Sequence, residues 1–173
     1  MPTHDATTAS CHVLTFKEGM LSAIAHDLRL RVERFRVELD DDGRSITARF
    51  EADSLRVECA VKDGRDDPGA LRDGQRRDIE ANIAKDVLHA RRHPTIEFRS
   101  TAVHGEGDQR QIEGTLRLHG VERSIHATAR REGGRWSAEV SIHQPDFGIK
   151  PFSAMLGTLK IQPQVRVRIS VPG

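Results

Sequence analysis

The feature that most constrains this chain is a two-residue alternation of apolar and charged side chains. In one segment Leu28, Leu30 and Val32 alternate with arginines. Successive side chains of a β-strand point to opposite faces of a sheet, so such a segment forms a strand with one apolar and one charged face. The same alternation occurs in residues 11–16, 35–39, 46–57, 96–99, 112–118, 125–129, 136–142 and 159–171. The sequence therefore predicts an all-β fold.

Phase shifts and turn signals organise these strands. The apolar side chains change parity near residues 33–34, and a one-residue slip would turn every later side chain to the other face, so we predict a β-bulge or bend there. A similar shift precedes Leu55. Residues 41–43 (DDG) and 133–134 (GG) are typical hairpin turns. About eight antiparallel strands suit a closed barrel, either filled or holding one small ligand, although alternation alone does not separate a barrel from a sandwich.

One segment departs from the alternation. Ile79, Ile83 and Val87 recur at a spacing of four within residues 75–88, which predicts one short amphipathic helix. Asp73 is its candidate N-cap.

Length and composition restrict the domain organisation and the function. A chain of 173 residues fits one domain, and we expect a flexible N-terminus over residues 1–9 and a single barrel domain over residues 10–173. The net charge is +1, which favours neither nucleic acid nor an anionic membrane. Aromatic residues make up 4%, too few for a stacking platform that binds nucleic acid.

The same sequence indicates a compartment. No apolar run approaches membrane-spanning length, and the first ten residues lack the basic start and apolar core of a signal peptide. We therefore expect a cytoplasmic protein in which Cys11 and Cys59 are reduced thiols.

Three motifs carry a family likeness through their order and spacing. Residues 93–100 (HPTIEFRS) match a "YP-x-I-x-F-x-S" strand, residues 114–121 (GTLRLHGV) match a "G-x-L-x-x-x-G-V" hairpin strand, and residues 146–149 are DFGI. From about residue 10 to the C-terminus the chain resembles the YceI-like, polyisoprenoid-binding family. It departs from the family pattern at His93, where Tyr is common, and at residues 25–28 (AHDL), which replace an early "H-L-G" strand start.

The resemblance implies an extended lipocalin-like antiparallel β-barrel that holds an amphipathic lipid, typically an isoprenoid, in an elongated cavity. It also implies a homodimer. A dry tunnel binds a long alkyl chain without catalytic groups, because each buried methylene contributes about 0.8 kcal/mol. Our first interpretation is a protein that binds, sequesters or carries an isoprenoid or other long-chain lipid and needs no cofactor.

The candidate ligand-binding residues come from the strands and from the irregular segment before the last strand. The strand residues are Phe16, Leu28, Leu30, Phe98, Leu116 and Trp136. The irregular segment supplies four apolar residues that either cover one end of the cavity or pack in the core: Phe147, Phe152, Met155 and Leu156. Small side chains thin out the apolar face and favour a cavity, although they also suit close packing: Ala48, Ala52, Ala127, Ala129 and Ala138.

His26 followed by Asp27 lies at a strand start near an expected barrel mouth. A histidine paired with a carboxylate acts as a base or orients a polar head group. We favour a polar pair that ties down a loop, because no nucleophile context is present. Two alternatives to lipid binding remain: a small-molecule enzyme with His26 as general base, and a ligandless module that binds partners through an exposed strand edge.

The chain has nine histidines, which raises the question of a metal. His89 and His93 are four residues apart, but the HExxH pattern is missing. A zinc site needs three or four converging ligands, and the sequence does not bring them together. We therefore predict no metal site and no catalytic residues.

Overall fold

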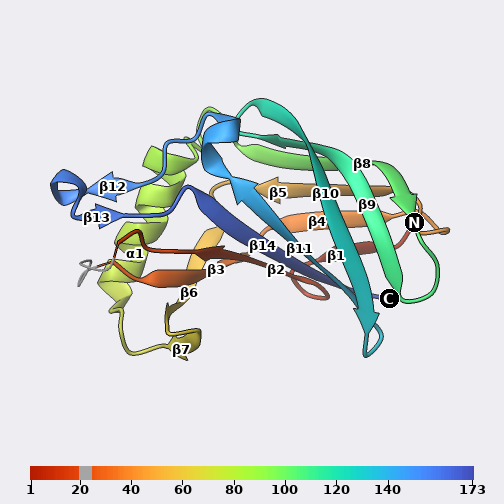
Figure 1. Cartoon of the computed structure of the whole chain (residues 1–173), viewed down its shortest axis with the longest axis horizontal. Helices are drawn as coiled ribbons and strands as arrows, with labels where there is room; N and C mark the ends of the chain where they lie inside the picture. The colour runs from red at the N-terminus through yellow and green to blue at the C-terminus, as the bar shows by residue number, and fades with distance from the viewer. Residues whose placement is uncertain (20–24) are drawn as a thin grey trace.

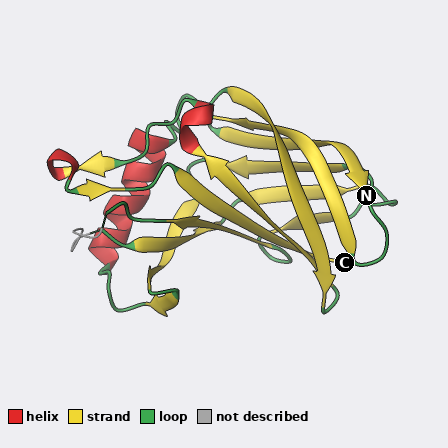
Figure 2. Ribbon diagram, in the orientation of Figure 1, coloured by secondary structure: helices red, strands yellow, loops and turns green. Residues whose placement is uncertain are grey.

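The computed structural model describes residues 1–19 and 25–173, with the side chain of Met155 left out. Twelve strands of the described residues form one antiparallel sheet that curls round an interior (Figures 1 and 2). They are β1 (Thr3–Asp5), β2 (Ser10–Thr15), β3 (Asp27–Val32), β4 (Phe35–Leu39), β5 (Ile46–Glu51), β6 (Leu55–Lys62), β7 (Arg65–Asp67), β8 (Thr95–His104), β9 (Gln109–Leu118), β10 (Val121–Glu132), β11 (Arg135–His143) and β14 (Gln164–Pro172). Their order in the sheet is β1-β4-β5-β8-β9-β10-β11-β14-β2-β3-β6-β7.

A bent hairpin brings the two halves of the sheet together. β3 continues into β4 through residues 33–34, and β5 continues into β6 through residues 52–54. β4 pairs with β5 and β3 with β6, while β5 also pairs with β8 and β3 with β2. In the described part of the chain, counting each bent strand once and omitting the short edge strands β1 and β7 leaves eight strands round the interior. The all-β, lipocalin-like fold and the bend near residues 33–34 are therefore confirmed.

A fully buried serine holds this corner. Ser54 is 0% exposed, and its hydroxyl donates to the carbonyl of Glu51 at 2.8 Å and accepts from the backbone N–H of Arg34 at 3.1 Å. The carbonyl of Ser54 accepts the N–H of Glu33 at 3.0 Å. These bonds satisfy backbone groups that lose their ladder partners where the strands bend.

The predicted helix is present as α1 (Asp73–Asn82), continued by a π-helical turn over Ile83–Val87. It lies across one end of the curled sheet (Figure 1). The N-cap prediction is wrong: the cap is Arg72, and Asp73 is already helical. The Arg72 N–H is instead satisfied by Oε1 of Gln75 at 2.9 Å. No helix in the described residues has the length and apolar content to cross a membrane.

A bulge in β6 ties the helix to the sheet. The β3–β6 register shifts so that Arg29 faces Cys59 but Leu30 faces Val57. The Val57 N–H donates to the carboxylate of Glu80 on α1 at 2.9 Å. A side chain of the helix thus accepts the hydrogen bond of a backbone N–H at the bulge.

The two ends of the chain differ from expectation in detail. The N-terminus, expected to be flexible, contains β1, which pairs with β4 from Thr3 opposite Glu38 to Asp5 opposite Arg36. Such long-range pairing leaves no local signal in the sequence. The final alternation is divided into β13 (Leu159–Lys160) and β14, with Pro163 in the break, where its missing N–H does not interrupt a ladder.

A small hairpin stands apart from the main sheet. β12 (Ser153–Ala154) pairs only with β13, and the turn Met155–Gly157 joins them. A short 3-10 turn, Gln144–Phe147, leads towards it from β11. The hairpin projects beyond α1 at the helix-covered end of the molecule (Figure 1).

Candidate functional site

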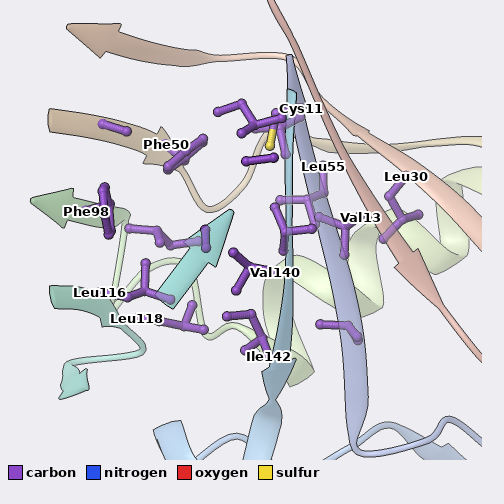
Figure 3. A pocket seen from close by; sticks show the side chains of 18 of the residues that line it. Cys11, Val13, Leu30, Phe50, Leu55, Phe98, Leu116, Leu118, Val140 and Ile142 are labelled. Carbon is purple, nitrogen blue, oxygen red and sulfur yellow. The ribbon is translucent and has the colours of Figure 1, made fainter. Parts of the chain in front are cut away.

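The interior of the curled sheet is an apolar cavity of about 990 Å³, at the upper end of the range of about 300–1,000 Å³ for small-molecule sites. Apolar side chains from strands all round the sheet point into it, among them Leu30, Phe50, Phe98 and Val140 (Figure 3). The cavity extends from α1 to the opposite end, where the two chain termini lie (Figure 1).

Strand parity creates this wall. Along β3, Leu28, Leu30 and Val32 are 7%, 1% and 4% exposed and line the cavity. The intervening Arg29 points outward, where it donates to the carboxylates of Glu58 at 2.6 Å and Asp66 at 2.7 Å. Alternation thus separates an apolar interior from an ion-paired exterior.

The structure places most of the predicted site residues on the cavity wall. These are His26, Leu28, Leu30, Phe98, Leu116, Trp136 and Phe152. Four of the five small residues also line it, namely Ala48, Ala127, Ala129 and Ala138. Ala52 is 1% exposed and lies at the bent corner instead.

Three predicted site residues lie elsewhere. Phe16 follows the cavity-lining Thr15, and its ring lies under the guanidinium of Arg166 with 5.3 Å from Cζ to the centroid. Phe147 is 3% exposed and packs in an apolar cluster, as in the core-packing alternative. Leu156 is 108% exposed at the hairpin turn. The remaining predicted site residue is Met155, whose side chain is outside the described part of the structure.

Sequence reasoning missed two groups of wall residues. The residues of the first group belong to the apolar faces that the alternation predicts, so the alternation is sufficient to identify them. They are Val13, Ile46, Phe50, Ile112, Val140 and Val167. The second is the apolar stripe of the helix segment, whose Ile79, Ile83 and Val87 line the cavity. The sequence predicts the apolar stripe but not the surface it covers, because the residues of a helix do not specify which part of the fold the helix packs against.

Polar side chains that line the cavity gather at its two ends. Those near α1 are Thr15, His26, Gln75, Asp78, Asn82 and Gln144, and those near the termini are His4, Asp40, Asp41, Asp42, Arg110, Arg131 and Ser137. The Thr15 hydroxyl is buried with no partner in the described structure. Such ends suit a polar head group, whereas the stretch between them suits an apolar chain.

Asp27 holds the loop between β2 and β3. Its carboxylate accepts the backbone N–H of Lys17 at 2.8 Å, as expected for a polar residue that ties down a loop. The neighbouring His26 lines the cavity at the helix end, where an imidazole is placed to contact a bound molecule.

Both cysteines are buried and have free thiols. Cys11 lines the cavity and is 1% exposed, and burial raises the pKa of its thiol to about 12. Burial also raises the pKa of Cys59. A protonated thiol is a poor nucleophile, so Cys11 contributes apolar surface to the wall.

Three histidines meet beside the cavity at the helix-covered end. Nδ1 of His119 lies 3.2 Å from the carbonyl of Phe147, and its Nε2 lies 2.9 Å from Nδ1 of His89. A carbonyl only accepts, so the neutral His119 ring donates from Nδ1 and accepts at Nε2 from His89. The ring of His93 lies 4.6 Å from that of His119, centroid to centroid. No group of three possible ligands among the described residues is arranged to hold a metal.

Comparisons with known proteins agree with this geometry. A family model described as the YceI-like domain matches residues 5–172, whereas no curated protein matches the chain. Among solved structures, BcnA of Burkholderia cenocepacia is 14% identical with a TM-score of 0.67, over 98% of both chains. A polyisoprenoid-binding domain from Saccharophagus degradans, implicated in plant cell wall breakdown, is 12% identical with a TM-score of 0.62, over 99% of this chain and 98% of that one.

A YceI protein of Campylobacter jejuni is 13% identical with a TM-score of 0.62, over 84% of both chains. At these identities the solved structures show a shared fold. The family model covers nearly the whole chain, so this protein belongs to the YceI-like family.

Proposed function

We propose that the protein binds one long-chain, amphipathic lipid of the isoprenoid type inside the barrel and carries or sequesters it. The observation that supports this most directly is the cavity of about 990 Å³ with an apolar wall. Charged side chains meet the cavity only at its ends among the described residues, so the wall offers an apolar chain no unpaired charge.

Burial supplies the driving force. Each methylene buried in such a cavity contributes about 0.8 kcal/mol, and about ten of them contribute on the order of 8 kcal/mol before the costs of association and ordering. An unbranched or isoprenoid chain therefore binds by its length, without directional contacts along the wall.

The ends of the cavity explain why the lipid is amphipathic. The unpartnered Thr15 hydroxyl and the amide of Gln144, which is 7% exposed, lie at the helix end. A buried hydroxyl without a hydrogen-bond partner is costly, and a head-group oxygen would satisfy it. The polyisoprenoid-binding domain of Saccharophagus degradans, which shares the fold, supports the isoprenoid class.

Two measurements test this function. Denaturing mass spectrometry of an organic extract of the purified protein should find a copurifying long-chain lipid. Titration with geranylgeraniol in detergent should change the fluorescence of Trp136, which lines the cavity, in a saturable manner with one lipid per chain. Absence of any response to isoprenols and fatty acids by an intact barrel would contradict the proposal.

A further inference from the structure

The tip of the β12–β13 hairpin exposes a large apolar side chain, Leu156, to solvent. Leu156 is 108% exposed, and among the described large apolar residues only Met1 is also exposed. Leu156 has a φ of 59°, in the left-handed region that a bulky residue seldom adopts. Both its exposure and its backbone conformation are unfavourable for the isolated molecule.

Basic side chains lie on this hairpin and beside its base. The chain has five lysines, and three of them belong to the hairpin or the segments beside it: Lys17, Lys150 and Lys160. All three are exposed. The aliphatic stem of Lys160 lies along the turn, within 3.2 Å of where a side chain on Gly157 would begin. Two acidic residues also lie beside these segments: the N–H of Glu18 donates to the carbonyl of Lys160, and the carboxylate of Asp27 accepts the N–H of Lys17.

The other side of the same segment belongs to the cavity. Phe152, Ala154, Leu159 and Ile161 line its helix-covered end, so the hairpin forms part of the wall there. It pairs with the rest of the molecule only through the bridge between Lys17 and Ile161 among the described β-contacts. The exposed tip is therefore at the edge of the cavity, beyond α1 (Figure 1).

We propose that this hairpin docks on a bilayer that contains anionic phospholipids, with Leu156 inserted between head groups and Lys150 and Lys160 on the lipid phosphates. The inference rests on the proposed lipid-carrier function, because docking would hold the end of the cavity against the store of its ligand. The chain as a whole has a net charge of only +1, so attraction comes from the local group of lysines, each of which strengthens binding near an anionic surface.

Flotation of the purified full chain with vesicles tests the docking. Wild-type protein should float with vesicles of phosphatidylcholine plus phosphatidylglycerol, and far less with phosphatidylcholine alone. Leu156→Asp and the double variant Lys150→Glu with Lys160→Glu should each bind roughly tenfold more weakly, because apolar insertion and attraction to anionic lipid act together. Leu156→Phe should retain binding. Raised salt should release the wild type.

Arg130→Glu provides the charge control for the single reversals Lys150→Glu and Lys160→Glu, because each of the three variants changes the net charge by two units. Arg130 is exposed on β10, near the turn at residues 133–134 and therefore at the opposite end of the barrel. This reversal should leave flotation unchanged, and none of the surface variants should lower the melting temperature appreciably. Equal loss in Arg130→Glu would show attraction by overall charge alone and would overturn the hairpin as the docking site. Absence of flotation by the wild type would do the same, and is the result expected if the tip binds a protein instead.

Titration with geranylgeraniol in detergent, followed by Trp136 fluorescence, tests the lipid-carrier function separately from membrane docking. Leu156→Asp should take up the dispersed lipid as the wild type does while losing vesicle binding. Wild-type uptake without flotation would overturn the docking and leave the carrier function intact. Flotation without uptake would overturn the carrier function.

Discussion

The barrel wall and the helix-covered end of the cavity are held together in different ways. The wall consists of long ladders, with β9 and β10 paired from Val121 opposite Leu118 to Arg130 opposite Gln109. At the helix-covered end, by contrast, single side chains bridge separate segments: Glu80 to β6, Asp27 to the β2–β3 loop and His119 to Phe147. A strand ladder contains many backbone hydrogen bonds, so one substitution removes few of them. A bridge made by a single side chain is lost when that residue is replaced. We therefore expect the wall to set the stability of the fold and the helix-covered end to set access to the cavity.

The largest effect is expected in the wall. Leu116 is 7% exposed and lines the cavity, so Leu116→Asp would bury an unpaired charge at a cost of several kcal/mol. We expect this variant to unfold or to lose lipid uptake. Circular dichroism and the Trp136 titration measure the two outcomes.

Arg117→Asp is the matched control, one residue along the same strand. Arg117 is exposed on the outer face, so its replacement should change the melting temperature little and leave uptake intact. If Arg117→Asp were the damaging variant, the inward and outward faces of β9 would be interchanged.

A smaller effect is expected at the helix anchor. Glu80→Ala would leave the Val57 N–H without its partner, which costs about 1–3 kcal/mol if that donor stays buried. Chemical denaturation should show this loss. Glu80→Gln keeps an acceptor and should recover much of the stability. Faster lipid exchange in Glu80→Ala, measured by stopped-flow Trp136 fluorescence, would identify this end as the route of entry; an unchanged rate would argue against it.

The histidine cluster should make the helix-covered end sensitive to acid. Burial, together with the charges of His93, His89 and Arg92, lowers the pKa of His119 below its ordinary 6.5, although the bond to Phe147 opposes the shift. The unfolded chain therefore takes up a proton at a higher pH than the folded one. Stability that is present above pH 6.5 should fall as the pH is lowered from there towards the folded-state pKa.

His119→Asn tests this dependence. Asparagine tolerates the positive φ of 54° at this position and does not titrate. Melting temperatures measured across the acid range should decline less steeply for the variant than for the wild type. Parallel declines in the two proteins would assign the acid sensitivity to other groups.

The smallest effect is expected for thiol labelling of the wall. Cys11 is buried and burial raises its pKa to about 12, so a thiol reagent should react slowly with the native protein and quickly after unfolding, without prior reduction. Glu80→Ala should scarcely alter the native rate at Cys11 if the wall and the helix-covered end open independently. A large acceleration would show that the two regions open together.

Much of the wall was predictable because strand geometry is local. Leu28 and Leu30 face the cavity, and Arg29 faces outward, for the same reason that they alternate in sequence. The parity change at residues 33–34 likewise predicts the bend between β3 and β4, which places these two strands in different halves of the sheet. Phe16 does not line the cavity, because Thr15 does and strand alternation turns the next side chain to the other face.

The sequence by itself determined the long strands, their apolar faces, the hairpin turns and the single helix, since each depends on residues adjacent along the chain. Only the tertiary structure decided which segments meet: α1 over one end of the barrel, Ser54 at the corner, and His89 beside His119. It also decided that Phe147 packs in the core while Leu156 stands in solvent. These outcomes depend on contacts between residues far apart in the chain, and a local pattern of polarity does not specify the partner of a buried or exposed face.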